Sequence, residues 1–483
     1  MKILKLVQKV LLSAICLLLL FMILTPVKVY TKLEPFLESQ RKNYGFPSLS
    51  AALVTLDEPT VFFTLGCTSQ GISPQPKTPY FIASLSKSFT ALAVNKLSRD
   101  YGFSLDTPIS ELISEYKSVF NYGDKITVRH LLSHASGLSD ITFQENLPWD
   151  ASIYEGAMSL AKAKPLTSIE TKFNYFNMGY TVLGYLIEKV TETSFSDYLK
   201  TEILEPLNLN NTFVSTKEAP ITVNGHISLF GFLKQLDNYQ KLYALPSGFI
   251  LSSTYDLSIL ARYYLDPTTL PNNSGLLPID LLLLQTPAFK NWPYGFGWFI
   301  SQERGYHIVQ HSGSLEGYLS HFLFWPEKKT AFIILTNSNS TFQSLFAVNS
   351  IIKGTEAILF DGQTVIKPVC HYINFIFWLL TLFLQVSVLK QFFSLGKYRF
   401  NNNLKNTVFL RTFYLSTFIF WLMLFIFFPF LAGQLINRGL NWSFALSIEP
   451  CIFGLLGFLF LTQALIGFIR FFLLFDTSKK YNR

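Results

Sequence analysis

Apolar residues are distributed very unevenly along this 483-residue chain, and that distribution limits what the chain can fold into. An uncharged stretch of 18 residues, 10–27, follows three lysines near the N-terminus. From about Cys370 onward the sequence is dominated by Phe, Leu and Ile, whereas residues 31–369 have an ordinary globular composition. The mean hydropathy of +0.31 therefore averages two kinds of sequence that need different solvents. We expect a globular region flanked by membrane-spanning segments.

Three further stretches of 18 to 22 residues in the C-terminal region are almost free of charge, at 372–389, 412–433 and 448–469. Each is long enough to cross the hydrocarbon core as a helix, so together they predict a three-helix transmembrane region over residues 370–476 and a tail at 477–483. Residues 1–30 are either an uncleaved anchor or a cleaved signal segment. The anchor is favoured because no small-x-small cleavage site follows the apolar stretch.

Basic residues in the short loops predict the orientation of these spans. The loop 390–411 contains five Lys or Arg and no acid, and the tail after the third span holds four against Asp476, whereas the loop 434–447 has only Arg438. Since basic loops stay on the cytoplasmic side, we expect loop 390–411 and the C-terminal tail inside. The globular region then lies outside the cell, in a multi-pass protein of the cell membrane, and the basic N-terminus independently gives the same orientation.

The formal net charge of +8 belongs to the flanks and not to the globular region. Residues 31–369 contain 25 basic and 29 acidic side chains, so this region lacks the basic excess that a nucleic-acid-binding domain requires. Of the four cysteines only Cys67 lies in it, which leaves no disulfide framework and no C-x-x-C metal motif. We expect Cys67 to be a buried small apolar side chain.

Local patterns in the globular region predict an α+β domain with an antiparallel sheet. Apolar residues recur at helical spacing in residues 84–98 and 180–190. Strands at both ends of the region, with helices between them, predict that the terminal segments share one sheet. The predicted strands cover residues 48–54, 60–65, 306–310, 319–325 and 331–336.

Ser84 and Lys87 are the first candidates for chemistry, in the tetrad Ser84-Leu85-Ser86-Lys87. A separation of three residues at the start of a helix puts both side chains on one face, within reach of each other. A serine hydroxyl becomes a good nucleophile when a neighbouring base takes its proton, and a lysine serves as that base if its surroundings favour the neutral amine. Alone, however, Ser-x-x-Lys often occurs by chance on a solvated helix.

Two later motifs give this pair a context. The triplet Tyr175-Phe176-Asn177 follows Ser84 by 91 residues, and His311-Ser312-Gly313 comes just after a predicted strand. This order resembles the penicillin-recognising serine hydrolases, most closely the class C β-lactamase-related branch, which includes penicillin-binding proteins, esterases and D-amino-acid peptidases. The similarity covers about residues 35–350 and implies one β-lactamase/transpeptidase-like hydrolase domain over residues 31–360. Further matching stretches are residues 126–138, 205–209, 246–248, 294–298 and 311–317.

The resemblance implies a role for each motif residue. Ser84 would attack a carbonyl to form an acyl-enzyme, with either Lys87 or the phenol of Tyr175 as the general base. Asn177 would donate its amide to the substrate or to Lys87. Backbone N–H groups of Ser84 and Ser314, beside Gly313, would stabilise the oxyanion.

His311 is the departure from the pattern. The β-lactamases and transpeptidases usually have Lys there, a permanent cation that suits a substrate carboxylate, whereas histidine is largely neutral at pH 7. The change weakens the case for β-lactam hydrolysis and fits the esterase and peptidase relatives.

The combined prediction is an outward-facing serine hydrolase, without metal or cofactor, that acts on an ester or D-amino-acyl amide, with cell-wall peptides or esters as substrates by location. His130 and His134 have the i, i+4 spacing of two metal ligands, but the glutamate of H-E-x-x-H is absent. The alternative is a β-lactam or wall-fragment sensor that is acylated without turnover. The short cytoplasmic segments lack a signalling motif, which argues against it. The sequence leaves the oligomeric state open.

Overall fold

The computed structural model divides into two compact units. The larger comprises Gly45–Ile227 and Leu233–Ser350, and the smaller comprises Met1–Tyr44, Ser228–Phe232 and Ile351–Arg483. The structure describes residues 2–366 except for 69–70, 141–146, 220–222, 230–231, 238–239 and 341–342. Beyond residue 366 it describes 376, 379–380, 382–387, 390–391, 414–423, 425–426, 456–457 and 459–470.

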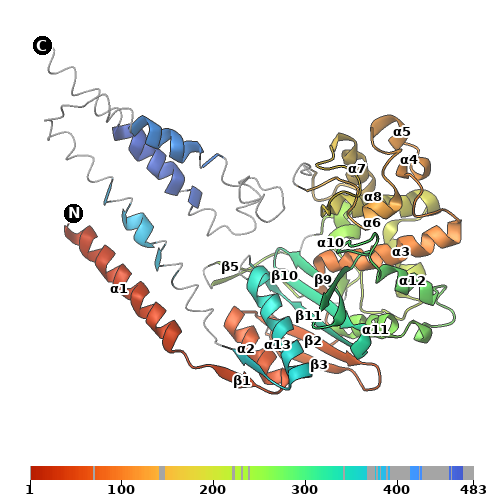
Figure 1. Ribbon diagram of the computed structural model, residues 1–483, viewed down its shortest axis with the longest axis horizontal. Helices are drawn as coiled ribbons and strands as arrows, with labels where there is room; N and C mark the ends of the chain where they lie inside the picture. The colour runs from red at the N-terminus through yellow and green to blue at the C-terminus, as the bar shows by residue number, and fades with distance from the viewer. Residues whose placement is uncertain are drawn as a thin grey trace, which may run out of the picture. The chain divides into compact units, whose positions relative to one another are not determined.

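A six-stranded antiparallel sheet in the order β3-β2-β11-β10-β9-β8 forms one layer of the larger unit. Strand β2 from the N-terminal part pairs with β11 from the C-terminal part, so the two lie side by side inside the sheet (Figure 1). The register places Thr55 opposite Thr330 and Leu49 opposite Thr336. The strands are β2 (Ser48–Thr55), β3 (Val61–Gly66), β8 (Phe299–Glu303), β9 (Tyr306–Leu315), β10 (Tyr318–Trp325) and β11 (Thr330–Thr336).

The predicted α+β organisation and the shared sheet are confirmed, whereas two details of the strand prediction are wrong. The sequence pattern gave no strand at β8, because Gln302 and Glu303 are polar and this edge strand has a neighbour on one side only. Strand β9 continues to Leu315 instead of ending at Gln310, because its last residues stay paired with β10, with His311 opposite Phe322.

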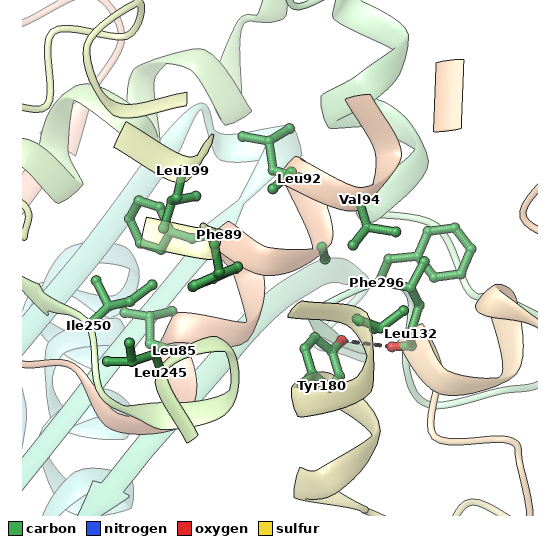
Figure 2. Packing of buried hydrophobic residues seen from close by; sticks show 14 of the residues in the cluster. Leu85, Phe89, Leu92, Val94, Leu132, Tyr180, Leu199, Leu245, Ile250 and Phe296 are labelled. Carbon is green, nitrogen blue, oxygen red and sulfur yellow. Dashed lines mark hydrogen bonds between the residues drawn. The ribbon is translucent and has the colours of Figure 1, made fainter. Parts of the chain in front are cut away.

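The helical part of the larger unit is built around α3 (Ser86–Tyr101), which is buried at every residue from Ser86 to Ser98. Figure 2 shows Leu85 and Phe89 packed among Leu199, Leu245 and Ile250. The remaining helices are α4 (Ile109–Leu112), α5 (Tyr116–Val119), α6 (Val128–Leu132), α7 (Ile153–Ser159), α8 (Asn177–Thr191), α9 (Phe195–Leu199), α10 (Leu245–Gly248), α11 (Thr254–Leu265) and α12 (Pro278–Leu284). Short strands are β4 (Tyr80–Phe81), β5 (His226–Leu229), β6 (Phe232–Gln235), β7 (Leu251–Ser252) and β12 (Ser338–Asn339).

In the smaller unit, α2 (Leu33–Tyr44) packs closely against α13 (Val348–Asp361). A Cβ atom at Gly354 would lie 2.2 Å from the tip of the Phe36 ring, so the contact requires glycine. Strand β1 (Lys28–Tyr30) pairs antiparallel with β13 (Thr364–Ile366). This ribbon joins the segment after the N-terminal helix to the segment that leads into residue 367.

The N-terminal helix α1 (Lys2–Leu24) is, among the described residues, the one helix long and apolar enough to cross a membrane, a test that signal sequences also pass. Leu11 and Ile15 are buried against Leu379 and Val386. Near the start of α1, Gln8 Nε2 donates to Ser387 Oγ (2.7 Å) and Gln8 Oε1 accepts from Lys390 Nζ (3.1 Å). The start of α1 therefore lies beside the end of the first predicted C-terminal span, as in an antiparallel helix pair.

The three predicted C-terminal spans fall largely outside the described residues. Two shorter apolar helices, Tyr414–Met423 and Leu459–Arg470, lie within the second span and at the end of the third. The described part of each is shorter than a helix that crosses a bilayer. The described residues thus support one helix of membrane length, and the three-helix region stays a prediction.

Gly297 allows the loop before β8 to touch the backbone of α3. It has φ +77°, and a Cβ atom there would lie 2.8 Å from Ser88 Cα and 2.9 Å from Lys87 O. Both the left-handed conformation and the missing side chain are therefore needed at this position.

We expect Gly297→Ala to destabilise the fold more than Gly305→Ala. Gly305, in the turn between β8 and β9, also has a positive φ (+82°), but a Cβ atom added there would have no other atom within 4 Å. The control should therefore lose about 1 kcal/mol of unfolding free energy from strain alone, and Gly297→Ala about 2 kcal/mol more from overpacking. Urea unfolding of the detergent-solubilised chain measures both; equal losses would contradict the close contact with α3.

Candidate active site

Ser84 lies in a single 3-10 turn, Ala83–Leu85, immediately before α3, and it is half-buried. Ala83 adopts a left-handed conformation with φ +49°, which costs an alanine about 1 kcal/mol. Two contacts hold this turn: Ile82 N–H donates to Ile250 O (3.0 Å), and Ser320 Oγ donates to Ile82 O (2.6 Å). The candidate nucleophile is thus presented by a strained turn fixed from two sides.

The side chain of Lys87 is fully buried, on the first turn of α3. Its ammonium has three protons and needs an acceptor for each, because an unpaired buried charge is costly. Two acceptors are close and one is longer: Ser247 O at 2.6 Å, Asn177 Oδ1 at 2.7 Å and Ser84 Oγ at 3.4 Å. The structure therefore brings Ser84 and Lys87 together, as their spacing predicted.

Tyr175 and Asn177 reach the same place from the start of α8. The Tyr175 ring centroid lies 4.9 Å from Lys87 Nζ, and the ring is half-buried. Asn177 accepts the lysine hydrogen bond through Oδ1, while its Nδ2 donates to Asp140 Oδ2 (2.6 Å) and its backbone N–H donates to Asp140 Oδ1 (3.0 Å). A carboxylate only accepts and an ammonium only donates, so these partners assign the amide orientation.

His311 is buried on β9, and both of its ring nitrogens have partners inside the protein. Nδ1 donates to the backbone oxygen of Ser312 (2.7 Å), and Nε2 accepts from the hydroxyl of Tyr294 (2.9 Å). Burial, aided by the positive charge of Lys87, lowers the pKa of His311 to about 3. His311 is therefore a neutral imidazole at pH 7, as the sequence led us to expect.

Gly313 lets strand β9 run directly against the turn that holds Ser84. A Cβ atom at this position would lie 2.2 Å from Ile82 O and 2.1 Å from Ser320 Oγ. Ser314, the next residue, is exposed, and its Oγ accepts from Asn339 Nδ2 (3.0 Å). The role of the Ser84 and Ser314 N–H groups in an oxyanion hole stays a prediction.

Three groups at the site had no assigned role at the level of sequence. Ser247 contributes a backbone oxygen, which no residue type signals, and β4 pairs with β7 to hold its segment beside the Ser84 turn. Tyr294 fell within a matching stretch, but its bond to His311 was not foreseen. Asp140 lies at the end of the matched stretch around residues 126–138, 37 residues before Asn177, and sequence spacing gives no hint of their contact.

The two histidines considered for a metal site serve the scaffold instead. His130 Nε2 lies 2.7 Å from Glu170 Oε1, and His134 Nδ1 accepts from Phe176 N–H (3.2 Å). His134 lies beyond the end of α6 with φ +57°, so the pair does not share a helical face. Among the described residues, no group of three or more His, Cys, Asp or Glu side chains could hold a metal ion.

Cys67, expected to be buried, is exposed. It directly follows the edge strand β3, where the sheet ends and few side chains cover it.

The arrangement can perform acyl transfer. A half-buried hydroxyl faces a buried amine, and the ring of Tyr175 lies beside that amine. A buried amine with fixed partners is the kind of base that activates a serine.

Comparisons with known proteins agree with this geometry. The family described as Beta-lactamase matches residues 33–353. Protein flp of Staphylococcus aureus (strain MRSA252) is 25% identical over 427 residues, 83% of this chain and 82% of that protein. Penicillin-binding protein 4* of Bacillus subtilis (strain 168) is 28% identical over 319 residues, 58% of this chain and 65% of that protein. The solved structure of the octameric penicillin-binding protein homologue from Pyrococcus abyssi is similar with a TM-score of 0.58 and 26% identity, covering 68% of this chain and 77% of that one.

The similarity to the flp protein is longer than the family match. Residues 1–353 make up less than 83% of the chain, so this alignment must continue into the segment after residue 353. In contrast, the match with penicillin-binding protein 4* spans slightly less than two thirds of that protein's length.

Three buried neutral histidines predict a fold that acid destabilises. Burial lowers the pKa of His321 to about 4, that of His311 to about 3, and that of His134 well below its usual range. Since the unfolded chain takes up protons near pH 6.5 and the folded chain does not, the free energy of unfolding should fall as the pH drops below 6.5.

For His321 this dependence should extend from pH 6.5 down to about pH 4. We expect His321→Gln to reduce the slope of unfolding free energy against pH by up to about 1.4 kcal/mol per pH unit in that window. Urea unfolding at stepped pH values measures the slope. An unchanged slope in the variant would show that His321 is protonated in the folded protein.

Proposed function

This chain belongs to the beta-lactamase family and is a serine hydrolase, and from that premise we propose that it is anchored in the cell membrane, forms an acyl-enzyme at Ser84, and acts outside the cell on an ester or a D-amino-acyl amide. The family match confirms the resemblance drawn from Ser84, Lys87, Tyr175 and His311. One observation carries the assignment of the site: the buried amine of Lys87 lies between Ser84 Oγ and two short acceptors.

The hydrogen-bond pattern around Lys87 supports its role as the base. A neutral amine has two protons and one lone pair. If the two protons occupy the short bonds to Asn177 Oδ1 and Ser247 O, the lone pair is left for the hydroxyl of Ser84. Ser84 Oγ then bonds to the substrate carbonyl carbon as its proton passes to Lys87, directly or through the Tyr175 phenol, and the leaving group departs with a proton from the same groups.

The substrate class follows from the neutral state of His311. Because both ring nitrogens are bonded within the protein, this residue offers neither a positive charge nor a free N–H group to a carboxylate. The site therefore suits an acyl group without a carboxylate at that position, such as an ester or a D-amino-acyl amide. For an enzyme that faces the cell wall, the substrates of that class are D-alanyl esters of wall polymers and wall peptides cut at a bond away from their terminal carboxylate.

Two features support a hydrolase domain that lies outside the cell on a multi-pass anchor: the charges of the loops and the helix contacts in the smaller unit. Gln8 contacts Ser387 and Lys390, so the N-terminal helix and the first C-terminal span would begin and end on the same side of the membrane. That is the orientation which the basic N-terminus and loop 390–411 predict. The helix contact also supports an N-terminal segment that is retained as an anchor.

We expect a fluorophosphonate probe to label the detergent-solubilised chain at Ser84. Ser84→Ala should abolish labelling, and Lys87→Ala should slow it by at least about 100-fold, because a serine without its base is a poor nucleophile. Ser88→Ala is the control, since this buried serine, one turn further along α3, donates only to Leu85 O. In-gel fluorescence and peptide mass analysis measure the result. Labelling that survives in Ser84→Ala would refute the assignment.

Turnover separates the hydrolase from the sensor. A hydrolase releases many equivalents of p-nitrophenol from a p-nitrophenyl ester for each Ser84. A sensor would release one equivalent and remain acylated, which the intact mass of the protein would reveal.

Cys67 provides a test of orientation. It is exposed in the larger unit, so a membrane-impermeant maleimide should label it in intact cells if that unit lies outside. Cys67→Ser is the control for labelling at this position. Labelling that requires cell lysis would place the unit inside and contradict the proposed topology.

A further inference from the structure

Asp140 holds the amide of Asn177 with both of its carboxylate oxygens. Oδ2 accepts from Asn177 Nδ2 at 2.6 Å, and Oδ1 accepts from the backbone N–H of Asn177 at 3.0 Å. Two bonds to one residue fix both the side-chain torsion and the face of the amide. The amide oxygen is then left for Lys87 Nζ, at 2.7 Å.

The orientation of this amide decides where the lone pair of Lys87 points. With Oδ1 toward the lysine, the amine donates to Asn177 and to Ser247, and its lone pair faces Ser84. If the amide turned by 180°, Nδ2 would donate to the amine and occupy the lone pair. The lone pair of the Lys87 amine would then point away from Ser84, although the same residues would remain in contact.

We propose that Asp140 is a positioning residue of this hydrolase: it holds Asn177 with Oδ1 toward Lys87, and so keeps the lysine amine directed at Ser84. The inference rests on the proposed roles of Ser84 and Lys87. It adds a residue that acts through Asn177, on the loop after α6 in a segment otherwise occupied by scaffold residues such as Ser139 and His134.

Asp140→Asn tests the proposal with a minimal change of shape. The new amide keeps one acceptor oxygen for the backbone N–H of Asn177, but its NH2 group opposes Asn177 Nδ2 and favours the turned amide. We expect the second-order rate constant of fluorophosphonate labelling to fall by about 100-fold in the full chain in detergent. The final extent of labelling should equal that of the wild type. This measurement serves as a folding control, because partial unfolding would lower the extent of labelling and not its rate constant.

The chain offers a matched control in a second pair of the same kind. Asp256 accepts from the backbone N–H and the Nδ2 of Asn211, at 2.6 and 2.8 Å, and it is buried on α11. Asp256→Asn makes the same change in an equivalent pair of bonds, keeping one acceptor oxygen and opposing an NH2 group to Asn211 Nδ2, at a site away from Lys87 and its hydrogen-bond partners. We expect a lower melting temperature and an unchanged rate constant. If Asp256→Asn slows labelling as much as Asp140→Asn, the effect is one of general stability and the proposal is overturned.

A double-mutant cycle tests the route through Asn177. In an Asn177→Ala background, Asp140→Asn should cause no further loss of rate, because the group that Asp140 orients is gone. A second loss of about 100-fold would show that Asp140 acts by another route and would overturn the proposal. A wild-type chain that does not react at all would overturn the proposed function and this inference with it, whereas equal rates for wild type and Asp140→Asn would overturn this inference alone.

Discussion

The burial of the Lys87 amine is the interaction on which the rest of the structure depends. An ammonium removed from water costs several kcal/mol unless each proton finds an acceptor, and two of the three acceptors come from segments 90 and 160 residues away. The start of α8 and the segment at α10 must therefore meet the first turn of α3. The close approaches at Gly297 and Gly313 serve this arrangement, since any side chain at either position would push its strand or loop away from the turn around Ser84 and Lys87. Close packing and the pairing of the Lys87 amine therefore both require these segments to meet at the first turn of α3.

The site also shows how a charged group can operate in apolar surroundings. Tyr175 and Tyr180 lie within 5.5 Å of the lysine nitrogen, measured to their ring centroids, and the neighbouring His311 and His134 are neutral because burial and the lysine charge disfavour their protonation. A second cation is thereby kept away from the Lys87 amine. His311 on β9 therefore presents no positive charge to the site.

Much of this arrangement was predictable from the sequence, and the features that the sequence did not predict were missed for identifiable reasons. The alternating strands around Ser48 and Ala331 predicted the shared sheet, and the order Ser84, Lys87, Tyr175, His311 predicted which side chains meet. Strand β8 was missed because its polar residues lie on an edge. Ser247 acts through its backbone, which has no side-chain signature. Asp140 was missed because the sequence does not indicate which of the many carboxylates will contact Asn177. The C-terminal spans rest on hydropathy and loop charge alone.

The pairing of β2 with β11 has a consequence for how the protein is made. Thr55 pairs with Thr330, so two interior strands of the sheet join residues that are separated by most of the domain. Closing so long a loop is slow, and the first strand must wait for the last. The ribosome therefore has to synthesise the entire helical region before the sheet can close. During that time the apolar strands are exposed and prone to aggregate.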